Sequence, residues 1–160
     1  MVGHTERLPE LELPPGRHVS SHEENDTMTH EARGTYVNVS ADEEPYDDSA
    51  RGAAMSRGRV DRRFDGAIAG ESVAAVLIAR GTAERLGYVA TDRFTGQVGD
   101  RSGTFVFQHG GSIDRGKLTP FGYVVPGTGT GELEGLTGEI RIEFVPPSTH
   151  AIILYYDFEL

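Results

Sequence analysis

The side chains best suited to acid–base chemistry gather between Asp92 and Tyr123. Arg101 could bind a substrate carboxylate or enolate, or it could form an internal ion pair with Asp92. As a histidine, His109 could act as acid or base, or it could be a rim histidine that hydrogen-bonds to backbone. The Tyr123 hydroxyl could polarise a substrate oxygen. We therefore take Arg101, Tyr123 and His109 as candidate catalytic residues.

A β-hairpin must position these residues. With Gln97 and Val98 as its two turn residues, Phe94 lies opposite Arg101 and Tyr88 lies opposite Phe107. One face of the hairpin is then rich in aromatic residues, and we expect it to line a barrel interior. The members of that face are Tyr88, Ala90, Asp92, Phe94, Arg101, Phe105, Phe107 and His109.

These aromatic residues could either fill the interior or form the walls of a cavity, and the pattern leaves both possibilities open. If they form a cavity, the predicted substrate-binding residues are Tyr88, Asp92, Phe94, Phe105, Phe107 and Tyr156.

Glycine-bounded apolar runs predict several more short strands. The expected strands are Thr35–Ser40, residues 54–65, Leu118–Val125, Glu139–Val145 and Ile152–Leu160. Val73–Ala79 is apolar on both faces and could be a buried strand or a short helix. An acidic loop is expected over Ala41–Ser49, and Phe121, Tyr123 and Val125 are expected to share one face of their strand. Together these patterns predict an all-β fold, a closed antiparallel β-barrel of about eight strands, lipocalin-like in shape and wide enough for one small ligand.

Several segments resemble a bacterial family of unknown function. They are Phe64–Gly70, Arg101–Phe105 continuing to His109-Gly110, Gly127–Leu133 and Leu154–Asp157. The barrel of that family is similar to that of allene oxide cyclase, and the resemblance covers roughly residues 50–160. It implies the same barrel and suggests a cyclase, although one fold hosts many chemistries.

The amino-terminal part of the chain differs in composition from the rest. Residues 1–50 hold 12 acidic and 3 basic side chains, whereas residues 51–160 hold 13 and 12. We divide the chain into an extension, residues 1–28, and a barrel domain, residues 29–160. Pro9, Pro14 and Pro15 break regular structure in the extension, which favours a disordered tail. An apolar cluster of leucines in the same segment could instead make it a lid over the barrel mouth.

Composition also limits the partners that we expect. The chain has a net charge of −10 and lacks a basic stripe, which disfavours nucleic acid and anionic membranes. It has no cysteine, which excludes disulfides, thiolate metal sites and cysteine nucleophiles. No apolar signal segment is visible, so we expect a cytoplasmic protein. His18 and His22 lack a fixed scaffold for a metal, and Gly127–Gly131 lacks the lysine of a phosphate loop, so we expect no metal and no cofactor.

Three functions fit this sequence. The first is a cofactor-free cyclase or isomerase that closes a ring, possibly by cycloaddition, in a hydrophobic polyene or polyketide-like substrate. The second is a non-catalytic barrel that binds a small hydrophobic ligand. The third is a filled barrel with a structural role. A homodimer is compatible with all three.

Overall fold

The computed structural model describes residues 28–47, 52–145 and 149–159, and these residues form nine β-strands. The strands are β1 (His30–Asp47), β2 (Ala54–Gly66), β3 (Ile68–Thr82), β4 (Arg85–Val98), β5 (Arg101–Asp114), β6 (Lys117–Val124), β7 (Thr130–Gly131), β8 (Leu136–Val145) and β9 (Thr149–Phe158). Within the described ranges, no helix is long and apolar enough to cross a membrane.

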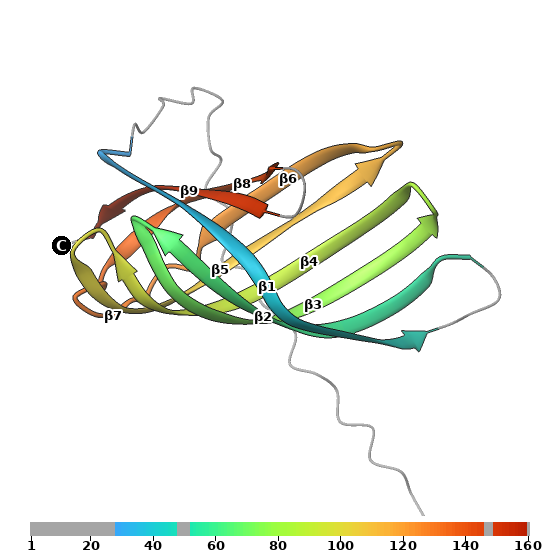
Figure 1. The fold of residues 1–160 in the computed structure, drawn as a ribbon, viewed down its shortest axis with the longest axis horizontal. Helices are drawn as coiled ribbons and strands as arrows, with labels where there is room; N and C mark the ends of the chain where they lie inside the picture. The colour runs from blue at the N-terminus through green and yellow to red at the C-terminus, as the bar shows by residue number, and fades with distance from the viewer. Residues whose placement is uncertain (1–27, 48–51, 146–148, 160) are drawn as a thin grey trace, which may run out of the picture.

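Eight of these strands close into a ring (Figure 1). The sheet order is β4-β3-β2-β1-β9-β8-β6-β5, and β4 also pairs with β5. All neighbours are antiparallel, and the short β7 adds to β5 outside the ring. The predicted all-β barrel of about eight strands is therefore confirmed, although the ring is not evenly round. The predicted extension, apart from Met28, lies outside the described residues, so its role as tail or lid stays a prediction.

Glycines allow two strands to approach at a corner of the barrel. Gly70 of β3 pairs with Gly96 of β4. A Cβ on Gly70 would lie 2.2 Å from the Thr95 carbonyl oxygen, and a Cβ on Gly96 would lie 2.1 Å from that of Ala69. No other residue type leaves room for this contact, so the glycines fix where the sheet bends.

The acidic segment after Ser40 is strand rather than loop, which corrects the prediction for residues 41–47. Arginines on β2 and β3 meet the acidic side chains: Glu44 pairs with Arg57 at 3.0 Å and Glu43 with Arg80 at 2.9 Å. Cross-strand ion pairs of this kind stabilise an exposed strand. Residues 48 and 49 of the predicted loop lie outside the described residues.

The β4–β5 hairpin turns two residues later than expected. Gly99 and Asp100 form the turn, Val98 pairs with Arg101, and Phe94 faces Phe105 rather than Arg101. Val98 is buried in the core, and Gly99 adopts a φ of 60°, which glycine tolerates at a turn. Because each strand shifts by a whole two-residue period, the predicted aromatic face still points inward.

Strand β6 presents the opposite face from the one predicted. Val124 is buried, whereas Phe121 and Tyr123 are 48% and 44% exposed on the outer surface. The inward positions include Gly122, where a Cβ would lie 2.7 Å from the Ile140 carbonyl oxygen. The interior at this level is already filled from β8, so the bulky residues of β6 lie outside.

The core fills one end of the barrel. Phe94, Phe105 and Phe107 are buried there, and Tyr156 packs against them from β9. Leu133 and Leu136 close the same end. The interior aromatic residues therefore form a packed core at this end. They do not fill the other end of the barrel, where the β5–β6 hairpin turns.

Candidate functional site

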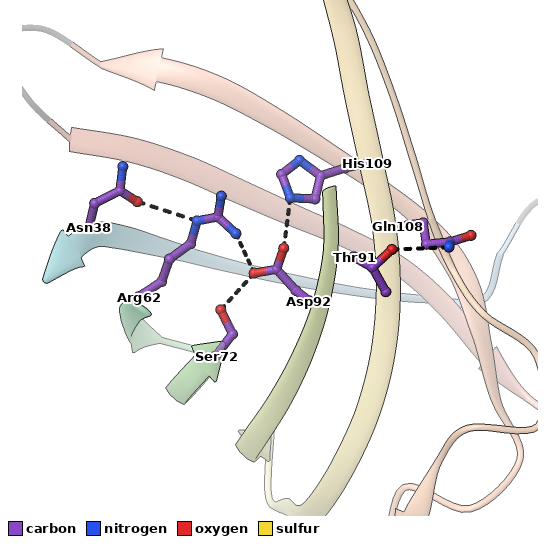
Figure 2. A network of polar contacts seen from close by, with 7 residues as sticks. All are labelled: Asn38, Arg62, Ser72, Thr91, Asp92, Gln108 and His109. Atoms are coloured by element: carbon purple, nitrogen blue, oxygen red, sulfur yellow. Dashed lines mark hydrogen bonds and ion pairs between the residues drawn. The ribbon is translucent and has the colours of Figure 1, made fainter. Parts of the chain in front are cut away.

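A chain of buried polar side chains crosses the barrel interior (Figure 2). Asp92 is fully buried, and its carboxylate accepts hydrogen bonds from Arg62 and from Ser72, the latter at 2.7 Å. Its other oxygen lies 2.9 Å from Nε2 of His109. Arg62 also donates through Nε to Asn38 at 3.3 Å. A carboxylate, a guanidinium and an imidazole thus share one buried network.

Five consecutive strands of the ring supply these residues. Asn38 lies on β1, Arg62 on β2, Ser72 on β3, Asp92 on β4 and His109 on β5. Asn38 pairs with Arg62, and Arg62 pairs with Ser72, so these three face inward at one level. Ser72 is small, and this leaves room above β3 for the Arg62 side chain to reach Asp92. The alternation of the strands therefore places the polar residues together without any loop.

Charge neutralisation decides the protonation of Asp92. Burial alone raises the pKa of a carboxyl group. The hydrogen bond from His109 and the charge and hydrogen bond of Arg62 together outweigh burial, so the pKa of Asp92 lies below its usual value. Asp92 is therefore a carboxylate at neutral pH. Because a carboxylate only accepts hydrogen bonds, Nε2 of His109 carries the proton.

A cavity of about 400 Å³ lies beside this network, at the end of the barrel where β5 turns into β6. Asn38, Arg62 and His109 give it a polar floor, and Tyr36 and Tyr88 add two hydroxyl groups. The remaining lining is mostly apolar or aromatic: Ile113, Gly116, Leu118, Ile142, Phe144 and His150. The site thus combines a few converging polar groups with an apolar wall, as small-molecule sites do.

Two imidazole nitrogens at this cavity lack a partner. Among the described residues, Nδ1 of His109 and Nδ1 of His150 are buried and make no hydrogen bond. An unpaired buried nitrogen is costly, and each such case calls for an explanation. His150 stacks on Tyr36 with ring centroids 4.8 Å apart. Burial and the charge of Arg62 lower the pKa of His150, which favours its neutral form.

The two tyrosines of the cavity also stay neutral. Burial raises the pKa of Tyr36 far above its usual value, and the opposing charge of Arg62 does not cancel the effect. Burial likewise raises the pKa of Tyr88. Both hydroxyl groups therefore keep their protons at physiological pH and can donate hydrogen bonds into the cavity.

The structure separates the three predicted catalytic residues. His109 is buried beside the cavity. Arg101 is exposed at the other end of β5, with its guanidinium 4.3 Å from the centre of the Phe158 ring, so the expected pairing with Asp92 is wrong. Tyr123 points outward and donates a hydrogen bond of 2.7 Å to Gln108, so its expected inward orientation is also wrong.

The predicted substrate-binding residues divide between two levels of the barrel. Tyr88 lines the cavity, and Asp92 lies directly beneath it in the network. The remaining four belong to the core at the filled end: Phe94, Phe105, Phe107 and Tyr156.

The sequence interpretation missed Arg62, the true partner of Asp92. The signal was present, because Arg62 shares the inward face of its strand with Val60 and Phe64, two positions away on either side. A basic residue between two apolar inward positions is a marker of a buried charge. Asn38, Ser72, Tyr36 and His150 carried no comparable signal.

No group of three or more His, Cys, Asp or Glu that could hold a metal ion occurs in the described part of the chain. His18 and His22 lie outside that part.

Residues 32–156 match the family described as "Protein of unknown function (DUF3224)". The chain belongs to the DUF3224 family. Its structure is similar to the crystal structure of a DUF3224 protein of unknown function from Shewanella oneidensis MR-1, with a TM-score of 0.72 and 28% sequence identity. That similarity covers 82% of this chain and 98% of the other. No curated protein matches the chain. The DUF3224 match spans every residue of the buried network.

Proposed function

We propose that this DUF3224 protein is a cofactor-free isomerase or cyclase that moves a proton on a small, largely apolar carbonyl compound. One observation carries the proposal: Asp92 holds Nε2 of His109, while Nδ1 of the same ring has no partner and His109 lines a cavity. An imidazole that is oriented by a carboxylate and free at its other nitrogen is the arrangement that general acid–base catalysis uses.

The size of the cavity limits the substrate. A volume of about 400 Å³ has room for roughly a dozen groups the size of a water molecule, since one water takes about 30 Å³. The apolar wall, Leu118, Ile142 and Phe144, favours a hydrocarbon portion, and the polar floor favours one oxygen-bearing group. A short unsaturated ketone or a compact polyketide-like fragment meets both conditions.

The reaction that fits is a proton transfer next to a carbonyl group. Nδ1 of His109 accepts the proton from the α-carbon, and the electron pair of the broken C–H bond forms an enolate. Arg62 lies beside the same floor and offers positive charge for the enolate oxygen, and Tyr36 or Tyr88 can donate a hydrogen bond to it. The enolate then takes the proton back from Nδ1 at another carbon, which is isomerisation. Alternatively, it attacks the β-carbon of an enone in the same molecule and closes a ring: the C=C π bond of the enone breaks, its electron pair forms a second enolate, and Nδ1 of His109 returns the proton to that enolate. Nothing is oxidised or reduced.

The resemblance of the sequence to barrels like that of allene oxide cyclase supports the cyclising form of this reaction. The cavity supports it too, because folding a flexible substrate between fixed walls removes much of the entropy cost of ring closure. In this proposal Arg62 takes the role first given to Arg101, and Tyr36 or Tyr88 the role first given to Tyr123.

Binding without catalysis is the alternative. The charge of Asp92 is already balanced by Arg62, so the network is also a plausible structural support for a cavity that only holds a small hydrophobic ligand.

Deuterium exchange distinguishes proton-transfer catalysis from ligand binding without catalysis. The protein would be incubated in D₂O with a set of small saturated and unsaturated ketones, with ligand-observed NMR to detect binding and mass spectrometry to detect deuterium at carbon. We expect a bound ketone to gain deuterium, and His109→Gln to slow this by at least about 100-fold. His30→Gln is the matched control, because His30 is exposed on β1. Bound ketones that exchange no faster than in buffer would reduce the proposal to binding alone.

A further inference from the structure

The outer face of the barrel over β2 to β6 carries an apolar surface of unusual extent. Its five large hydrophobic side chains are between 44% and 49% exposed: Val73, Leu77, Val89, Phe121 and Tyr123. They lie on three strands, β3, β4 and β6, and β5 runs between β4 and β6. Contiguous apolar patches of this kind usually mark an interaction site.

The patch is hollowed rather than convex. Three adjoining depressions of about 670, 460 and 560 Å³ lie over it. Leu77 and Val89 line the first two, and Ala75 and Thr91 line the first and third. Gly87 and Gly111, which lack side chains, lie in the second. A surface that has both protruding side chains and depressions can pack closely against a complementary surface.

Strand pairing arranges these residues in rows across the sheet. One row runs Arg57, Leu77, Val89, Gly110, Phe121 from β2 to β6. The next row runs Arg59, Ala75, Thr91, Gln108, Tyr123 over the same strands. In both rows the central member belongs to β4.

These rows are complementary to themselves about β4. A twofold axis along β4 would bring Leu77 of one copy over Gly110 of the other, where the Phe121 ring lies 2.8 Å from the Cβ position, so Leu77 would meet that aromatic ring. The same axis would bring Ala75 over Gln108, so that a small residue meets a larger one. The same axis would bring Arg57 onto Phe121 and Arg59 onto Tyr123, so that a cation meets an aromatic ring. Val89 and Thr91 would meet their own counterparts. Arg93 of β4 pairs with Val73, so it lies on the same axis one row beyond Thr91 and would meet its own counterpart at the solvent-exposed end of the patch.

We propose that this surface, the outer face of β2 to β6, binds a second copy of the chain through a twofold axis along β4. Self-complementarity of one patch is what a closed dimer interface requires. Five strands spaced about 4.8 Å apart, with four rows of outward residues spaced about 6.7 Å apart along the strands, give a patch of about 650 Å² on each copy. Two copies would bury about 1,300 Å², which falls within the range of specific interfaces.

The oligomeric state of the full chain is the first test. Analytical ultracentrifugation at micromolar concentrations should give twice the chain mass of 17.3 kDa. Val89→Lys places a charge on the axis and should weaken dimerisation at least about tenfold. Val37→Lys is the matched control, because Val37 is similarly exposed (41% against 48%) and lies on β1 away from the patch.

Cross-linking tests the axis without disrupting the surface. The chain has no cysteine, so Val89→Cys introduces a single thiol. A short bismaleimide should link Val89→Cys into a covalent dimer and leave Val37→Cys monomeric. A monomeric wild-type chain at about 100 µM, or a dimer that Val89→Lys leaves intact and Val37→Lys breaks, would overturn the proposal. The result does not depend on the proposed reaction, since the cavity lies inside the barrel.

Discussion

Replacing Asp92 by asparagine removes one charge and changes almost no volume, so it isolates the electrostatic role of this residue. Asp92 is fully buried and makes three polar contacts, with Arg62, Ser72 and His109. In Asp92→Asn the Arg62 guanidinium stays buried without its counter-charge. Breaking a buried ion pair in this way costs about 3–5 kcal/mol. At the middle of both ranges this is about 4 kcal/mol out of the roughly 10 kcal/mol that stabilises a typical domain, or about 40%.

Urea unfolding measures this loss. With a slope of about 2 kcal/mol per molar urea, the midpoint of Asp92→Asn should fall by about 2 M. Asp114→Asn is the matched control. Asp114 pairs with Arg85 at 2.9 Å, but its side chain is 70% exposed, so its loss should cost less than about 1 kcal/mol. If the two variants lose the same stability, the buried network does not hold the barrel together as described here.

The same variant has a pH signature. The folded-state pKa of Asp92 is lowered, so its contribution to stability is present above the unfolded value of about 4 and is lost as pH falls through the lower folded-state pKa. The wild-type protein should therefore lose stability below about pH 4 in part because Asp92 becomes protonated. Asp92→Asn should lack that part of the acid loss. An unchanged difference between the two proteins from pH 7 to pH 2 would contradict the low pKa.

Three further substitutions test the packing and the cavity. Gly122→Ala should destabilise the protein by about 1–3 kcal/mol, because its Cβ would lie 2.7 Å from the Ile140 carbonyl oxygen, while Gly87→Ala, where the nearest atom is 3.8 Å away, should change the melting temperature little. Phe94→Ala should cost about 3–5 kcal/mol in urea unfolding, and a loss under 1 kcal/mol would mean that the filled end is not a packed core. The lowered pKa of His150 predicts stability that is full above about pH 6.5 and declines as pH falls through the folded-state pKa, and His150→Gln should remove this decline between pH 7 and 5.

The sequence predicted which strands exist more reliably than how they pair. Alternation over residues 88–109 placed His109 and the phenylalanines on one inner face, because a shift of register by an even number of residues, here four, leaves every side chain on its own side. It did not predict the turn at Gly99, since turn position depends on whether Val98 is needed in the core. For β6, both faces carry apolar residues, so the pattern could not tell Tyr123 from Val124.

The partner of Asp92 could not be predicted from the hairpin alone. Arg101 is near Asp92 in sequence, whereas Arg62 is 30 residues away and reaches Asp92 across β3. The pairings of β2 and β4 with β3 bring Arg62 and Asp92 onto the same face. His150 depends on closure of the ring, because β9 pairs with β1. Long-range pairing, rather than local pattern, therefore decides the composition of the candidate site.

The central proposal is that Asp92 orients His109 through Nε2, and that the buried, unpartnered Nδ1 exchanges a proton with a ligand that enters the cavity. Nitrogen-15 NMR of histidine-labelled protein, with and without a bound ketone, tests it most directly. At neutral pH we predict a protonated Nε2, an unprotonated Nδ1 and a change at Nδ1 when the ketone binds. A proton on Nδ1 in the free protein, or a His109 signal unchanged by a ketone that binds in the cavity, would contradict the account.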